Sequence, residues 1–384
     1  MKKNFNIFIV LEVFFLSTCM CTKPNASDVD VLVEIDLDQS KQISYTEWFD
    51  SIQIIPLETN DQSIIGLSIK TFIYDDLIYI FDGKTHLINV FDKNGKFINN
   101  TSHIRGEGPN QYPGIQSIDI DEITGYISIY DFYKIRIFNS NFEFVNEFET
   151  PDELWSSGLN RLITEDLFLF FNYAPEEDFL FKVFSIKEKK IIKKIFPFEM
   201  GNEAKKMTAT RRQTFYKNND TLFFKTKFPD NKVYYFDSTK VDFFPRIEFK
   251  IKQEEFTSSK LIKDQDLQYY RGMAFSSDKY AFILEIFESE KYFFSLILYR
   301  KKGYLNRYDK KVGENQVVDH DFLDGISLLN PILIKDNVIY VRIDASMIRE
   351  YIEKSDFLSK KYNNLIKNIS EEDNPYIVKF FIKD

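Results

Sequence analysis

The residues of this chain that are best suited to holding a ligand gather in one loop rich in glycine and proline. The stretch "HIRGEGPNQYPG", residues 103–114, places Arg105, Glu107, Gln111 and Tyr112 among three glycines and two prolines. A guanidinium, a carboxylate, a carboxamide and a phenol together offer both donors and acceptors to a polar ligand. These four residues are therefore candidate ligand-binding residues.

The same loop has the glycine content of a phosphate cradle, but its neighbours do not fit one. Such a cradle needs consecutive backbone N–H groups followed by the first turn of a helix. Pro109 removes one donor, and the run "IQSIDI" that follows, residues 115–120, alternates as a strand does. We therefore interpret the loop as a corner in which glycines allow special backbone conformations and Tyr112 packs between neighbouring structural units. Ligand binding by the four residues is the alternative.

Three further residues are candidates for ligand binding. Trp155 and Tyr173 lie on long predicted loops and could stack on a sugar ring, although such aromatics more often pack in a core. Arg212, next to Arg211, could attract an anionic ligand, although an exposed basic pair is the simpler interpretation.

Signals for catalysis or metal binding are weak. The three histidines, His86, His103 and His320, form no His-Glu-x-x-His motif, and no Gly-x-Ser-x-Gly motif is present. The segment "DHDFLDG", residues 319–325, lacks the ligand spacing of a calcium loop. We predict no metal and no cofactor, and we assign no catalytic residue. Paired carboxylates contributed by distant loops, as in lyases and glycosidases, remain the alternative.

The elements that must position these residues are short strands in a repeat. Five times an aromatic residue closes an alternating run and a tight turn follows, at intervals of 47, 46, 52 and 63 residues. The five aromatics are Phe91, Phe138, Phe184, Phe236 and Tyr299. A recurrence near 40–50 residues with several strands per unit is typical of the blades of a β-propeller.

The number of second strands gives the number of blades. Six runs fit this position: 77–82, 126–131, 166–171, 221–226, 280–286 and 338–343. The fold class is therefore all-β, a six-bladed propeller of four-stranded antiparallel blades. Apolar residues at helical spacing predict a helical insertion at 345–372 in the last blade, followed by a strand at 376–384. That blade then lacks its fourth strand, so we expect the N-terminal segment, 31–37 or 52–58, to close it.

The long connections are predicted to share one face. Strands one and two of a blade should be joined by short turns, at 75–76, 165–166 and 277–279. Long segments should join successive blades, at 100–114, 149–158, 197–207, 250–269 and 308–324. Strands two and three should be joined at 172–178, at 227–231 and through the helical insertion. Long loops on a rigid scaffold are where binding sites are commonly built, so we expect this face to bind the ligand.

Composition and the N-terminus bound the class of protein. The net charge of −9 argues against nucleic acid as a partner of the 384-residue chain. Lys2 and Lys3 precede a short apolar run that ends in Leu-Ser-Thr-Cys, which predicts a signal peptide at 1–18 and lipidation of Cys19. Residues 19–29 would then be a lipid-anchored linker and 30–384 the propeller. The other thiol is Cys21, so no disulfide can form within the propeller.

Three stretches of the chain resemble the six-bladed β-propeller lipoproteins of gut-dwelling Gram-negative bacteria, whose architecture is related to NHL-repeat propellers. They are residues 54–66, 105–121 and 372–384. The family pattern Gly-x-Gly-Pro-Gly-Glu-Tyr is matched by Gly106, Gly108, Pro109 and Tyr112, whereas Asn110 and Gln111 replace a Gly and a Glu. The resemblance implies the fold and an outer-membrane lipoprotein facing the periplasm or the cell surface. It supplies no catalytic residues.

These observations favour an envelope-anchored, non-catalytic binding or scaffold lipoprotein. Its partner would be a glycan, a peptide or another envelope protein, and its only membrane contact would be the lipid anchor. A propeller enzyme with carboxylates in the central channel is the alternative, and a purely structural subunit of an outer-membrane complex is a third hypothesis.

Overall fold

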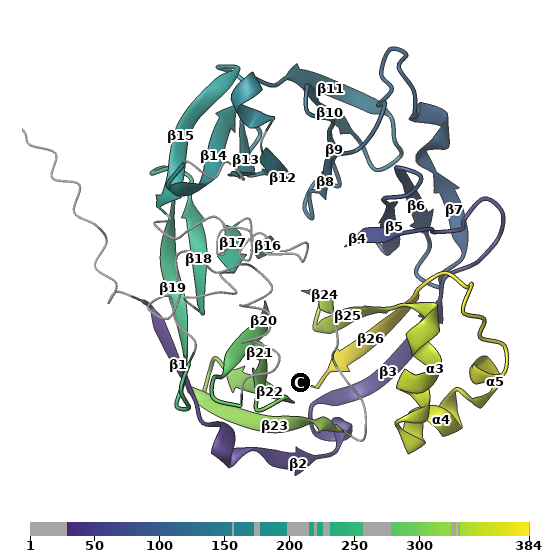
Figure 1. Ribbon diagram of the computed structural model, residues 1–384, viewed down its shortest axis with the longest axis vertical. Coiled ribbons are helices and arrows are strands. Elements are labelled where there is room, and N and C mark those ends of the chain that lie inside the picture. The colour runs from purple at the N-terminus through teal and green to yellow at the C-terminus, as the bar shows by residue number, and fades with distance from the viewer. Residues whose placement is uncertain are drawn as a thin grey trace, which may run out of the picture.

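The computed structural model describes residues 29–155, 157–172, 177–197, 215–218, 221–225, 231–255, 278–323, 328 and 331–383. Six small sheets stand in a ring around a central axis (Figure 1), which confirms the predicted six-bladed β-propeller. In each blade the strands that begin at or after residue 68 lie in sequence order from the axis outward, and strands of the N-terminal segment are added at the outer edges of the last three blades. We number the first four strands of each blade outward from the axis. Tyr173, Arg212 and Cys19 lie outside the described residues.

The first three blades are regular. Blade 1 contains β4 (Ser68–Tyr74), β5 (Leu77–Asp82), β6 (Leu87–Phe91) and β7 (Phe97–Asn100). Blade 2 contains β8 (Ser117–Ile120), β9 (Ile127–Tyr130), β10 (Lys134–Phe138) and β11 (Phe144–Glu149). Blade 3 contains β12 (Ser157–Leu162), β13 (Leu167–Asn172), β14 (Phe179–Ser185) and β15 (Lys190–Pro197).

The last three blades each include a strand from the N-terminal segment. Blade 4 contains β16 (Phe215–Asn218), β17 (Thr221–Lys225), β18 (Lys232–Asp237), β19 (Asp242–Ile251) and β1 (Val31–Ile35). Blade 5 contains β20 (Phe282–Glu288), β21 (Tyr292–Tyr299), β22 (Lys302–Asp309), β23 (Glu314–Leu323) and β2 (Lys41–Ile43). Blade 6 contains β24 (Pro331–Lys335), β25 (Val338–Ile343), β26 (Tyr376–Ile382) and β3 (Phe49–Pro56).

The two ends of the chain close the ring in blade 6, as predicted. β26 pairs antiparallel with β3, and Phe380 lies opposite Ile52 in that ladder. The donor is thus the second of the two candidate segments. The first candidate forms β1, which lies parallel to β19 in blade 4, and β2 continues along β23 in blade 5. The N-terminal segment therefore runs along the outer edges of three successive blades.

The strand assignment within blade 5 was wrong by one strand. β20 is the innermost strand of that sheet, and Tyr299 closes the second strand, β21. Both β20 and β21 are apolar and rich in aromatics, so the sequence does not distinguish the first strand from the second. Because Tyr299 lies one strand earlier than the other four aromatics, the misplacement shortens the interval. The 63 residues before Tyr299 reflect the long connection between β19 and β20. Residues 277–279 consequently precede the first strand, and 308–324 contain a tight turn and β23.

The predicted asymmetry between the two faces is confirmed. Every connection longer than six residues between described strands leads from strand two to strand three or from one blade to the next. We call that side the connection face. The turns between strands one and two and between strands three and four lie on the other side, which we call the turn face.

The predicted helical insertion is present and covers the outer edge of blade 6 (Figure 1). Its helices are α3 (Ala345–Glu353), α4 (Asp356–Lys361) and α5 (Asn363–Ile366). Buried Ile348, Ile352 and Leu358 pack in the same core cluster as β3. The Tyr362 hydroxyl accepts a hydrogen bond from the Ile54 N–H at 3.0 Å and donates one to the Ile52 carbonyl at 3.1 Å. The insertion thus protects an edge that would otherwise be open to pairing.

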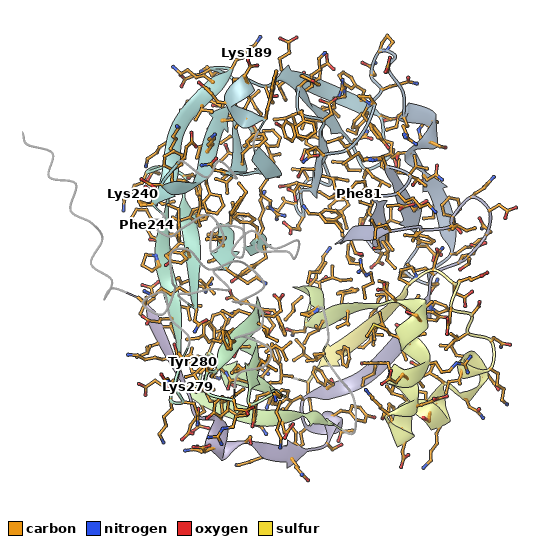
Figure 2. All side chains as sticks on the ribbon, viewed as in Figure 1. Phe81, Lys189, Lys240, Phe244, Lys279 and Tyr280 are labelled. Carbon is orange, nitrogen blue, oxygen red and sulfur yellow. The ribbon has the colours of Figure 1, made fainter. Side chains whose placement is uncertain are left out.

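Apolar side chains fill the spaces between neighbouring blades (Figure 2). Phe81 of β5 lies in the cluster between blades 1 and 2, together with Ile118 and Tyr112. None of the helices that the structure describes has the length and apolarity needed to span a bilayer.

Candidate functional site

The predicted loop at 103–114 is a corner built around Tyr112. Its side chain is fully buried between blades 1 and 2, and its ring centroid lies 6.4 Å from that of Phe138. Its hydroxyl lies 2.5 Å from the Thr101 hydroxyl and donates to the His86 carbonyl at 3.0 Å. Burial raises the pKa of Tyr112 to about 12. Because its hydroxyl is occupied by internal partners, Tyr112 positions the loop.

The glycines of this corner act through their size. Gly106 and Gly108 do not have a positive φ. This differs from our expectation that the glycines of this loop adopt backbone conformations that other residues avoid. A Cβ on Gly106 would lie 2.3 Å from Gln111 Oε1, which accepts the Gly108 N–H at 3.0 Å. The left-handed conformation falls instead on Asn110, with φ 62°, where the resembled family has Gly. Arg105 and Glu107 are exposed on this corner.

The exposed aromatic side chains of the connection face gather at Trp155. Trp155 follows the short 3-10 helix Asp152–Leu154 between blades 2 and 3, and Tyr133 lies in the turn between β9 and β10. Their ring centroids are 5.4 Å apart at an interplanar angle of 76°. Trp155 is 44% exposed, Tyr133 64% and Phe132 37%. We call these three residues the aromatic platform.

A network of hydrogen bonds holds the turn of the platform. The Asp131 carboxylate accepts the N–H groups of Tyr133 at 3.1 Å and of Lys134 at 2.9 Å. Thr150 donates its N–H to the Tyr133 carbonyl and its hydroxyl to the Phe132 carbonyl, both at 2.9 Å. These contacts hold Phe132 at φ 79°, a strained conformation for an aromatic residue.

Sequence reasoning found Trp155 but missed Tyr133 and Phe132. The signal was the turn "DFYK", residues 131–134, which carries two aromatics where a tight hairpin normally has Gly or Asn.

The innermost strands of blades 1 to 4 carry charged side chains around the channel. Arg161 of β12 pairs with Asp119 at 3.0 Å and with Glu122, and Lys217 of β16 pairs with Asp121. Lys70 of β4 donates to the Ile118 carbonyl at 2.8 Å. Burial lowers the pKa of Lys70 to about 8. The channel therefore contains both signs of charge, mostly in pairs.

A second cluster surrounds the buried carboxylate of Glu288 at the end of β20. This carboxylate accepts hydrogen bonds from the Tyr216 hydroxyl at 2.5 Å, from Arg246 Nη1 at 2.9 and 3.1 Å, and from Lys310 Nζ at 2.5 Å. Burial and the adjacent Glu288 charge raise the pKa of Tyr216 well above its usual value. Burial lowers the pKa of Lys310, although Glu288 opposes that effect.

Both clusters border a cavity of about 730 Å³ at the turn-face mouth of the channel. Its lining comes from blades 1, 2, 4, 5 and 6 and includes Glu122, Lys217, Arg246, Glu288 and Lys310. That volume is in the range of small-molecule sites. Sequence reasoning placed the binding site on the connection face, with carboxylates in the central channel as the alternative, and it named none of the residues that line this cavity. The available signal was a charged residue inside an otherwise apolar strand, such as Glu288 in "FILEIFE".

The charged side chains of the cavity suit the binding of a polar ligand. Within the described part of the chain, no group of three or more His, Cys, Asp or Glu side chains could hold a metal ion. The carboxylates of Asp119, Asp121, Glu122 and Glu288 each have a cationic partner.

Two crystal structures of Bacteroides proteins share this fold. A Bacteroides fragilis protein that carries the provisional name of an exported protein aligns with a TM-score of 0.71 at 19% identity, covering 92% of this chain and 100% of its own. A member of the DUF4221 family from Bacteroides vulgatus aligns with a TM-score of 0.52 at 9% identity, covering 87% of this chain and 97% of its own. At these identities the similarity extends to the fold alone.

The sequence itself identifies a family. No curated protein matches the chain in sequence. The family described as "Domain of unknown function (DUF4934)" matches residues 29–381, which is nearly all of the propeller. The chain therefore belongs to the DUF4934 family.

Proposed function

We propose that this protein is an envelope-anchored, non-catalytic binding module that recognises a neutral glycan through the aromatic platform. The observation that carries the proposal is the edge-to-face pair of Trp155 and Tyr133, two exposed rings contributed by different blades. Burying large aromatic side chains is strongly favourable, so rings left exposed on a rigid support mark a binding surface. Stacking on the apolar face of a sugar would bury them.

The charges beside the platform favour a neutral ligand. Asp152 and Glu153, three and two residues before Trp155, are exposed carboxylates. Lys134 and Arg136, the nearby cations, pair with Glu147 and Asp131. An anionic polysaccharide would therefore meet uncompensated negative charge.

The backbone of the turn supports a binding role. A residue at φ 79° costs about 1–3 kcal/mol when it is not glycine. Phe132 adopts this conformation despite its energetic cost, and the resulting turn places Tyr133 beside Trp155. Strain that is held in place by surrounding hydrogen bonds is common at ligand sites.

We propose that the protein is exported and anchored in the cell envelope by lipid. The basic start, the apolar run and the Leu-Ser-Thr-Cys sequence support export and lipidation at Cys19. Several acyl chains hold a protein stably at a membrane. Metabolic labelling with a palmitate analogue should mark the protein, and Cys19→Ser should abolish the label; a label that persists in this variant would contradict the anchor.

Glycan binding can be tested by tryptophan fluorescence and calorimetry. The protein would be titrated with soluble xylan, mannan, β-glucan and starch oligosaccharides, with polygalacturonate as the anionic comparison. We expect at least one neutral glycan to change the Trp155 emission, and we expect Trp155→Ala and Tyr133→Ala to weaken its binding at least 10-fold. Tyr126→Ala, which removes a 39% exposed tyrosine from the turn face, is the matched control. Binding of none of these glycans, or equal binding by all variants, would exclude the platform as a glycan site.

The enzyme alternative rests on two adjacent carboxyl groups at the channel. Burial raises the pKa of Glu122, while hydrogen bonds from Lys217 and Thr124 hold the pKa of Asp121 low against the effect of burial. Neighbouring carboxyls with pKa values pushed apart are typical of acid–base pairs. New reducing ends formed from any of the same glycans, and lost in Glu122→Gln, would favour the enzyme over the binding module.

A further inference from the structure

The cavity at the turn-face mouth contains an arginine whose position is fixed from several sides. Arg246 Nη1 donates to both carboxylate oxygens of the fully buried Glu288. Its guanidinium carbon lies 4.7 Å from the ring centroid of Phe223 and 5.8 Å from that of Phe293. An arginine held by a buried carboxylate and two aromatic rings has little freedom to lose when a ligand binds.

Much of the hydrogen-bonding capacity of this arginine is unused. In the described part of the chain, Nε and Nη2 of Arg246 have no acceptor, and 26% of the side chain is exposed. A guanidinium edge with two parallel N–H groups matches the geometry of a carboxylate or phosphate. Lys310, 21% exposed, and Lys217, 7% exposed, line the same cavity and carry further ammonium protons.

The rest of the lining distinguishes this cavity from a simple ion site. Phe215, Phe287, Pro331 and Ile332 contribute apolar walls within the volume of about 730 Å³. Such a volume accommodates a ligand with an organic body as well as a charged group.

The acidic residues of the lining leave the arginine available. Glu122 is paired with Arg161, and Glu288 is shared between Arg246 and Lys310, so that two cations face one carboxylate. Glu290 and Asp336 are exposed, in the turn between β20 and β21 and in the turn between β24 and β25.

From these observations we propose that the cavity binds a small organic anion whose carboxylate or phosphate group pairs with Arg246 and whose apolar body lies against Phe215 and Phe287. The site is on the opposite face from the aromatic platform and does not depend on glycan binding. A protein with a net charge of −9 repels anions over most of its surface, so an anion that binds here must be recognised locally.

The probes for this site separate the charged group from the apolar body. Isothermal titration calorimetry would compare benzoate, phenyl phosphate, inorganic phosphate, acetate and the neutral isostere benzamide. We expect benzoate or phenyl phosphate to bind with 1:1 stoichiometry at least 10-fold more tightly than benzamide and more tightly than acetate or inorganic phosphate. Whichever of the two binds more tightly identifies the charged group as carboxylate or phosphate.

The assignment to Arg246 needs a variant that keeps the Glu288 ion pair. Arg246→Lys retains the positive charge and removes the paired N–H edge, so we expect it to weaken binding of the aromatic anion at least 10-fold. Arg300→Lys, the same exchange in the turn between β21 and β22 on the connection face, should bind as the unmodified protein does. Equal affinity for benzoate and benzamide, no measurable binding by any anion, or an unchanged affinity in Arg246→Lys would overturn the proposal.

A second measurement keeps the test valid if Arg246→Lys fails to fold. Phenylglyoxal modifies accessible guanidinium groups, and mass spectrometry of peptides locates the product. In the unmodified protein, the anion that binds should slow the modification of Arg246 at least 5-fold and leave that of exposed Arg300 unchanged. Equal rates at Arg246 with and without the anion would contradict the site.

Discussion

The indole ring of Trp155 meets the phenol ring of Tyr133 edge to face across the boundary between two blades, with ring centroids 5.4 Å apart. Trp155 belongs to the connection that leads into blade 3, and Tyr133 to a turn within blade 2. The pair therefore exists only when both blades are in place. The surface that we propose as the glycan site thus depends on the packing of blade 2 against blade 3.

The two tryptophans of the chain should respond differently to a soluble quencher. Trp155 is 44% exposed, whereas Trp48 is fully buried and donates its indole N–H to Gln316 Oε1 at 2.7 Å. We expect acrylamide to quench one part of the emission readily and to leave the other part nearly unquenched. Trp155→Phe should remove the accessible part and Trp48→Phe the protected part. Uniform quenching of both single-tryptophan variants would contradict the placement of the aromatic platform.

Removal of one hydroxyl should expose the edge of the closing strand. Tyr362→Phe deletes the group that accepts the Ile54 N–H and donates to the Ile52 carbonyl. We expect the free energy of unfolding to fall by about 1–2 kcal/mol, because two backbone groups lose a partner. Hydrogen exchange at the Ile54 amide should accelerate at least 10-fold. Tyr133→Phe, which alters an exposed tyrosine, should change neither quantity; unchanged exchange in Tyr362→Phe would show that the insertion does not protect β3.

Two glycine-to-alanine substitutions should have unequal costs. Gly95 has φ 86°, and a Cβ there would lie 2.1 Å from the Pro56 carbonyl oxygen at the end of β3. Neither backbone can move without disturbing the closing blade, so Gly95→Ala should lower the free energy of unfolding by at least about 2 kcal/mol. At Gly106 the nearest atom belongs to the flexible side chain of Gln111. Gly106→Ala should therefore cost less than about 1 kcal/mol; urea unfolding of the two variants compares them, and an equal loss would refute this account.

Lys70 should make stability depend on pH in the alkaline range. Burial lowers its pKa from 10.5 to about 8, while the Asp119 charge opposes that effect. Between these values the unfolded chain binds a proton that the folded protein has released, so the free energy of unfolding rises with pH. Below about pH 8 the lysine is charged in both states, and burying that charge costs stability in full. Relative to Lys70→Gln, the unmodified protein should gain at most about 3 kcal/mol between pH 8 and 10.5.

Urea unfolding of both proteins at several pH values measures this difference, and groups that titrate alike in the two proteins cancel. A difference that stays constant across the window would show that Lys70 keeps its ordinary pKa.

The radial architecture could be predicted because each blade repeats a similar local pattern of strands and turns. Period-2 alternation, turn residues and a recurrence of about 50 residues are local features, and together they predict six units and closure by the N-terminal segment. Only the structure shows that β3, the second of the two candidate segments, is the strand that closes the ring. The error in blade 5 has the same origin. Local pattern does not tell the first strand of a blade from the second when both are apolar, and only the position of β20 next to the axis settles the order.

The candidate sites were less accessible from the sequence. Tyr112 was singled out by its loop, yet its hydroxyl turned out to be occupied by Thr101 and His86. Glu288 and Arg246 are 42 residues apart and come from different blades, and nothing local indicates that they meet. Tyr133 could be recognised as part of a candidate site only after the structure showed its ring against that of Trp155.

By itself, the sequence determined the all-β class, the number of blades, the helical insertion and the side that carries the long connections, because each follows from the spacing of neighbouring residues. The tertiary structure alone decided which side chains share a cavity and which charges are paired, because those contacts join residues from different blades. Around a ring, such distances are set by how the sheets pack against one another, and a linear pattern does not record them.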